Sequence, residues 1–137
     1  MTVYSSPMQR ARRTAEIAGY PDPQVTPLLQ EYDYGDYEGK TSAEIRQVDP
    51  DWQLYRDGCP GGETPAQVYR RARDFIDLAV TASGPVIAFA HGHILRAIAV
   101  AWLSFDITSA IRFQLDVATL SILAVDQHDR GLKLWNA

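Results

Sequence analysis

Residues 85–90, Pro-Val-Ile-Ala-Phe-Ala, form a continuous apolar run of strand length that ends directly at His91 and Gly92. A run without polar alternation is typical of a strand covered on both faces, which is the situation of strands in parallel sheets. Such sheets alternate along the chain with helices that pack on their two faces. This segment therefore predicts an α/β fold in which residues 85–90 are a central strand.

The rest of the chain supplies alternating strand and helix signals that agree with this fold. Residues 2–5 are β-branched and aromatic, and Ser6-Pro7 is typical of a helix start. Residues 24–29 form a short extended run in which Pro27 indicates a strand end. Further patterns predict helices from Thr41, from Asp49-Pro50, from Thr64 to Ala79 and over 94–103, and strands over 118–126 and 132–136. We expect a mostly parallel sheet flanked by helices on both faces.

Length and charge narrow the functional classes. The 137 residues correspond to one domain, so we expect residues 1–137 to form a single domain. A formal net charge of −4 argues against a nucleic-acid partner, because phosphate backbones select clustered positive charge.

Compartment signals point to the cytoplasm. Cys59 is the only cysteine, so no disulfide can form within the chain, and residues 1–5 lack the features of a signal peptide. The most apolar window, residues 85–103, is interrupted by two histidines and Arg96, which is too polar for a membrane span. We expect a cytoplasmic protein that neither crosses nor binds a membrane.

Arg10, Glu31 and His91 each follow a predicted strand. Ligands of open parallel sheets bind at the carboxyl ends of the strands, so these side chains are expected to converge there. A guanidinium matches phosphate oxygens, helix-start amides add donors, and Gly92 permits a sharp strand-to-helix turn. The alternatives are that Arg10 is a solvated helix arginine and Glu31 an ordinary loop carboxylate.

The sequence His91-Gly92-His93 also raises the possibility of a metal site. No cysteine or third histidine lies at ligand spacing, and His128 falls in a predicted surface turn. A metal hydrolase is therefore the weakest alternative, and we predict no metal.

Four segments in order resemble the histidine phosphatase (phosphoglycerate-mutase-like) superfamily. They are residues 5–16 (SSPMQRARRTAE), 31–39 (EYDYGDYEG), 62–64 (GET) and 89–92 (FAHG). Segments 56–59 and 90–96 are most similar to its branch of sugar phosphatases and acid phosphatases.

The resemblance implies a role for each matching residue. Arg10 corresponds to a phosphate-clamping arginine, Glu31 to the catalytic proton donor, and His91 to the catalytic histidine that stabilises the transferring phosphoryl group. Gly92 and His93 are the further expected substrate-binding residues. No cofactor is implied.

One departure from the family pattern is large. The family's first strand carries an Arg-His-Gly whose histidine becomes phosphorylated, and this chain contains no Arg-His-Gly. By resemblance, the first central strand is missing and the domain is N-terminally truncated. An unpaired strand invites pairing, so we expect the gap to be covered by a second copy of the chain, in a homodimer, or by a rearranged terminus.

The predicted function is hydrolysis of a small phosphorylated metabolite, with a sugar phosphate favoured, through a phosphohistidine intermediate. The short stretch between Gly39 and Glu63 favours a phosphatase over a mutase by resemblance, and Trp52, Tyr55 and Arg56 are expected to help select the substrate. Without its nucleophile segment the chain is expected to be impaired or inactive. The alternative is a non-catalytic phosphate-binding or protein-interaction module.

Overall fold

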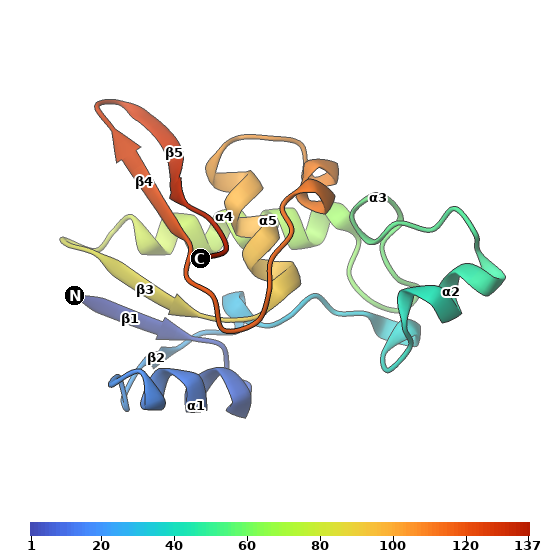
Figure 1. The fold of residues 1–137 in the computed structure, drawn as a ribbon, viewed down its shortest axis with the longest axis horizontal. Coiled ribbons are helices and arrows are strands. Elements are labelled where there is room, and N and C mark those ends of the chain that lie inside the picture. Colours follow the sequence, from blue (N-terminus) through green and yellow to red (C-terminus); the bar gives the residue numbers. More distant parts are fainter.

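A computed structural model describes all residues, 1–137, and its centre is a three-stranded parallel sheet. The strands are β1 (Thr2–Ser5), β2 (Gln24–Val25) and β3 (Val86–Phe89), in the order β2-β1-β3. β1 pairs in parallel with both neighbours, and its four residues match those of β3 from Thr2↔Val86 to Ser5↔Phe89 (Figure 1). The parallel α/β prediction is confirmed.

The helices are α1 (Gln9–Ile17), α2 (Ser42–Val48), α3 (Leu54–Asp57), α4 (Pro65–Ala79) and α5 (Gly92–Trp102). Three 3₁₀ segments, η1 (Pro27–Leu29), η2 (Gly35–Tyr37) and η3 (Ile107–Arg112), lie between them. None of the helices is long and apolar enough to span a bilayer.

Helices lie on both faces of the sheet, as the fold class requires (Figure 1). On one face, Tyr4 of β1 meets Phe75 of α4 edge to face, with ring centroids 5.7 Å apart. On the other face, Phe89 of β3 lies 6.1 Å from the ring of Tyr20, just beyond α1. Tyr4 and Phe89 are adjacent in register and point to opposite sides, as strand alternation demands.

The sequence explains how α4 begins and which face of it is buried. Thr64 accepts from the amide of Gln67, whose side chain accepts from the amide of Thr64, so the predicted capping box is present. The apolar face buries Val68 and Ala72 in the same core as α5. This helix provides a fixed base for the loops beside it.

Several predicted boundaries are wrong. The extended run over 24–29 is a strand only at Gln24–Val25, because Thr26 caps a 3₁₀ turn that Pro27 opens. The helix expected from Asp49-Pro50 starts only at Leu54, because Asp49 ends α2 and accepts from the amide of Trp52 in a turn.

The last two strands form a separate antiparallel hairpin, β4 (Ile122–Asp126) with β5 (Asp129–Leu134). The predicted turn over 127–131 shrinks to two residues, with Gln127 in the left-handed region at φ 56°. The strand predicted over 118–126 therefore began too early, and the strand predicted over 132–136 began too late.

One edge of β3 has no partner strand. β3 is hydrogen-bonded to β1 alone, and the hairpin stands apart from the three-stranded sheet (Figure 1). All four residues of β3 are partly exposed, so the expected burial on both faces is wrong for this chain. The cause is the absence of a second neighbouring strand, which is the gap that the family resemblance predicted.

Candidate active site

The parallel ends of β1 and β3 bring Ser6 and His91 together. The Ser6 amide donates to the carbonyl of Phe89 at 2.9 Å, which extends the ladder by one residue. Beyond it, Nε2 of His91 lies 2.8 Å from Oγ of Ser6. Ser6 is fully buried and His91 is 8% exposed. Ser6 was predicted as part of a helix start and of the segment 5–16 but not as a site residue; the signal for its site position is that it follows β1, whose end pairs with the end of β3.

Glu31 reaches the same place from the loop between η1 and η2. Its Oε1 accepts from the amides of Tyr32 and Ile94, both at 2.9 Å, and its Oε2 accepts from the amide of His93 at 3.2 Å. His93 and Ile94 lie in the first turn of α5, where amides have no acceptor within the helix. The Glu31 carboxylate thus caps the helix that begins directly after His91.

Arg10 approaches from the first turn of α1. It is exposed and lines an open hollow of about 490 Å³ with Met8, Gln9 and Arg13. The pKa of His91 is lowered from its usual value, first by burial, and the charge of Arg10 lowers it further while that of Glu31 opposes the change. Both Arg10 and Glu31 therefore act electrostatically on His91, whose imidazole is neutral at neutral pH.

His93 sits beside this pair, with the rings of Tyr34 and Tyr55 packed against its partly exposed imidazole at 5.6 and 6.0 Å. Its Nδ1 lies 2.5 Å from the hydroxyl of Tyr34 and 3.8 Å from Oε2 of Glu31. The Tyr55 hydroxyl donates to the carbonyl of His93 at 2.9 Å. Burial lowers the pKa of His93, with Glu31 opposing and Arg96 assisting. Burial and the nearby Glu31 raise the pKa of Tyr34, so its hydroxyl stays protonated and can donate.

Gly92 occupies the first position of α5. Its backbone does not adopt a positive φ, and a Cβ at this position would meet no atom within 4 Å. Gly92 was expected to permit a sharp strand-to-helix turn, and the turn is present at this position but does not require glycine. The space beside Gly92 and its helix-start amide, which has no acceptor within the helix, remain open to a ligand.

The residues expected to select the substrate do not gather at this site. Trp52 is buried, and its Nε1 donates to the carbonyl of Gly58 at 2.8 Å. Tyr55 is also buried, and it contacts the site at His93, through a hydrogen bond to the carbonyl and an edge-to-face ring contact at 6.0 Å. Arg56 pairs with Asp57 and lines a different groove.

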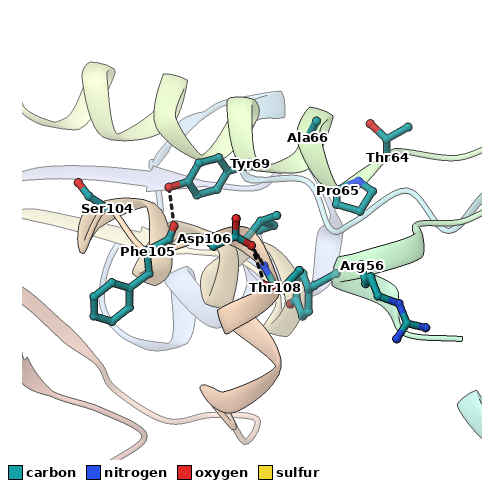
Figure 2. Close-up of a pocket in the computed structure, with 11 residues that line it drawn as sticks. Arg56, Thr64, Pro65, Ala66, Tyr69, Ser104, Phe105, Asp106 and Thr108 are labelled. Atoms are coloured by element: carbon teal, nitrogen blue, oxygen red, sulfur yellow. Dashed lines mark hydrogen bonds between the residues drawn. The ribbon is translucent and has the colours of Figure 1, made fainter. Parts of the chain in front are cut away.

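That groove is lined by residues of α3, α4 and the segment around η3, and has a volume of about 660 Å³ (Figure 2). The Tyr69 hydroxyl crosses it to the carbonyl of Phe105 at 2.7 Å. None of Arg10, Glu31, His91 and His93 lines it.

The chemistry of the site suits an anion. The start of α5 lies beside two imidazoles, its amides hold the Glu31 carboxylate, and the positive charge of Arg10 lowers the pKa of His91. No group of three or more histidine, cysteine, aspartate or glutamate side chains is arranged to hold a metal ion.

Comparison with known proteins shows the family of this chain. The sequence model of the histidine phosphatase superfamily (branch 1) matches residues 1–137. A protein of Mycobacterium tuberculosis named acid phosphatase is 39% identical over 132 residues, which cover 95% of this chain and 65% of that protein. Sedoheptulose 1,7-bisphosphatase of Saccharomyces cerevisiae is 31% identical over 131 residues, covering 77% of this chain and 48% of that protein.

Solved structures agree with these matches. The structure of an open reading frame from Mycobacterium tuberculosis superposes with a TM-score of 0.96 at 37% identity, covering 98% of this chain and 71% of that one. A mycobacterial glucosyl-3-phosphoglycerate phosphatase gives a TM-score of 0.83 at 26% identity, covering all of this chain and 77% of that one. The chain spans less than two thirds of the length of the curated relatives named above.

Proposed function

Because the chain belongs to the histidine phosphatase superfamily, branch 1, we propose that it serves the hydrolysis of a small phosphomonoester. The observation that carries the proposal is the placement of Glu31 and His91 at the start of α5, with Arg10 near enough to affect the charge of His91. The names of the relatives support a phosphorylated sugar or sugar acid as the substrate class.

In this mechanism Arg10, protonated His91 and the open amide of Gly92 hold the phosphoryl oxygens. They stabilise the negative charge that spreads over those oxygens in the transition state. His91 is neutral in the free protein, so it takes up a proton as the anion binds. His93, which follows Gly92 in the first turn of α5, contacts the part of the substrate beyond the phosphate.

Glu31, which takes up a proton from solvent as the phosphoryl anion binds beside it, donates this proton to the departing alkoxide. Its Oε1 is occupied by two amides at 2.9 Å, whereas Oε2 accepts only the longer 3.2 Å bond from His93. We therefore assign the transferable proton to Oε2. The O–P bond breaks as this proton moves to the leaving oxygen, and the phosphoryl group passes to a histidine nucleophile.

The nucleophile itself is not among the described site residues. Neither His91, His93 nor His128 is part of an Arg-His-Gly sequence. We propose that the nucleophilic histidine comes from a strand outside these 137 residues that pairs with the open edge of β3. The second candidate function, a phosphate-binding module without turnover, is favoured by the same observation, because the anion site is present while that motif is not.

A direct experiment separates the two candidates. The coding sequence upstream of Met1 is read, and any in-frame segment ending in Arg-His-Gly is added to the chain. Hydrolysis of p-nitrophenyl phosphate and of sedoheptulose bisphosphate is then compared between the extended and the 137-residue forms. We expect much faster turnover in the extended form, with a phosphohistidine trapped by denaturation at alkaline pH.

Two results would overturn this assignment. A stop codon in place of the upstream strand, together with phosphate binding and no turnover, would establish the non-catalytic module. Full activity of the 137-residue chain with phosphate on His91 would make His91 the nucleophile and reverse its role.

We further propose that a second copy of the 137-residue chain covers the free edge of β3 in solution. The edge is apolar over residues 86–89 and lacks hydrogen-bonding partners on one side. Such an edge readily pairs with another strand. In the extended form the added strand would occupy this edge, so the dimer should form only without it.

A further inference from the structure

Glu31 lies outside any helix or strand, yet its carboxylate must meet two amides of α5 within hydrogen-bond distance. An unsupported loop would not hold it there. We propose that Arg71 and Glu63, acting together, are the positioning residues for Glu31. This inference deepens the proposed function, in which Glu31 is the proton donor.

The guanidinium of Arg71 holds the stretch of chain that leads into Glu31. Nη1 donates to the carbonyls of Leu28 and Gln30 at 3.0 and 2.6 Å, and Nη2 donates to the carbonyl of Glu31 itself at 3.4 Å. Nε and Nη2 also donate to the two carboxylate oxygens of Glu63 at 3.0 and 2.8 Å. These five bonds match the five N–H donors of a guanidinium, whereas the three donors of lysine could not make them all.

Glu63 holds the chain on the other side of Glu31. Its Oε1 accepts from the amide of Asp33 at 2.9 Å, and its own amide donates to the carbonyl of Asp33 at 2.9 Å. A Cβ on the neighbouring Gly62 would lie 2.3 Å from the Asp33 carbonyl oxygen, so glycine is required for this close approach. Glu31 is thus fixed at both ends by one ion pair.

The ion pair is mostly buried, and Arg71 extends from a well-capped helix. The side chains of Arg71 and Glu63 are 17% and 18% exposed. Arg71 belongs to α4, whose N-terminus is closed by the capping box beginning at Thr64. The position of the Glu31 carboxylate is therefore set by a helix that contributes no side chain to the candidate active site.

The Arg71–Glu63 pair is therefore expected to affect amides that it does not contact. Neither residue of the pair hydrogen-bonds to His93 or Ile94, whose amides donate to Glu31. If the pair positions Glu31, breaking it will release those two amides on α5. If the pair only stabilises α4 and its loop, the amides will keep their acceptor.

The experiment measures amide hydrogen exchange by NMR in the 137-residue chain. In Arg71→Met we expect the His93 and Ile94 amides to exchange at least about tenfold faster, with the β1 amides unchanged. Arg71→Lys keeps a positive charge opposite Glu63, so it serves as a second variant should Arg71→Met fail to fold. In Arg71→Lys we also expect accelerated exchange of the His93 and Ile94 amides. Arg70→Met is the matched control, because Arg70 is the exposed neighbour and makes no side-chain hydrogen bond.

Unchanged protection of His93 and Ile94 in folded Arg71→Met or Arg71→Lys would overturn the proposal. A second measurement separates it from the proposed function: the ratio of turnover for an alkyl phosphate and p-nitrophenyl phosphate in the extended form. The alkyl leaving group needs a proton and p-nitrophenolate does not, so misplacing Glu31 should lower this ratio. Accelerated exchange with an unchanged ratio would keep the positioning role and overturn the acid role of Glu31.

Discussion

Oγ of Ser6 lies 2.8 Å from Nε2 of His91, and this contact joins two residues that are 85 positions apart in sequence and follow the paired strands β1 and β3. Both side chains are buried, and Oγ also accepts from the Met8 amide at 3.2 Å. The serine therefore orients the imidazole and connects it to the start of α1.

Ser6→Ala should leave Nε2 of His91 buried without its partner. We expect the free energy of unfolding to fall by about 1–3 kcal/mol, measured by urea denaturation, and phosphate affinity to weaken. Ser5→Ala is the matched control, since Ser5 is equally buried and its hydroxyl bonds only to the adjacent carbonyl. An equal loss of phosphate affinity in both variants would contradict the orienting role of Ser6.

Stability should depend on pH through the two site histidines. Burial lowers the pKa of His91 and of His93 in the folded chain, so between the folded values and about 6.5 the unfolded chain binds more protons. The free energy of unfolding should therefore have its full value above about pH 6.5 and fall as the pH decreases below this value. It should level off below the pKa values that His91 and His93 have in the folded chain.

Urea denaturation at a series of pH values between 7.5 and 5 tests this dependence. His93→Asn should flatten the curve, and the exposed His128 supplies the control variant His128→Asn, which should leave it unchanged. A curve that is flat in the unmodified chain would contradict the lowered pKa values.

The helices and strands that depend on neighbouring residues could be predicted from the sequence. The apolar run before His91 and the capping box at Thr64 depend on neighbouring residues, and both elements form where they were expected. The helix expected from Asp49-Pro50 failed because the start signal was used instead to end α2. Local signals cannot tell the end of one helix from the start of the next.

The site was predicted only in part, for a related reason. Arg10, Glu31 and His91 could be chosen because each follows a strand, but their partners come from distant segments. Ser6, Tyr34 and Arg71 contact the site residues across separations of 40 to 85 positions, which no local pattern encodes.

The free edge of β3 makes a prediction about assembly. Sedimentation velocity of the 137-residue chain should show a dimer, and Ile87→Lys should dissociate it, because a charge on an edge strand opposes pairing with a second strand. Val117→Lys is the control, since Val117 is exposed outside the sheet. A monomer with β3 amides protected on both sides would contradict this prediction.

The proton-donor role of Glu31 can be tested through the leaving group. Glu31→Gln keeps one oxygen for the amides of Tyr32 and Ile94, which both donate to Oε1, but it replaces Oε2, the acceptor of the His93 amide, by an NH2 group and removes the acidic proton. In the extended form we expect turnover of an alkyl phosphate to fall by about 10²–10⁴-fold, the usual contribution of general acid catalysis. Turnover of p-nitrophenyl phosphate should fall far less, because p-nitrophenolate departs without protonation.

Asp33→Asn is the control variant, because it alters an exposed carboxylate two residues away. It should change the turnover of both substrates equally or not at all. An equal loss on both substrates in Glu31→Gln would mean that Glu31 holds the start of α5 and donates no proton to the leaving group.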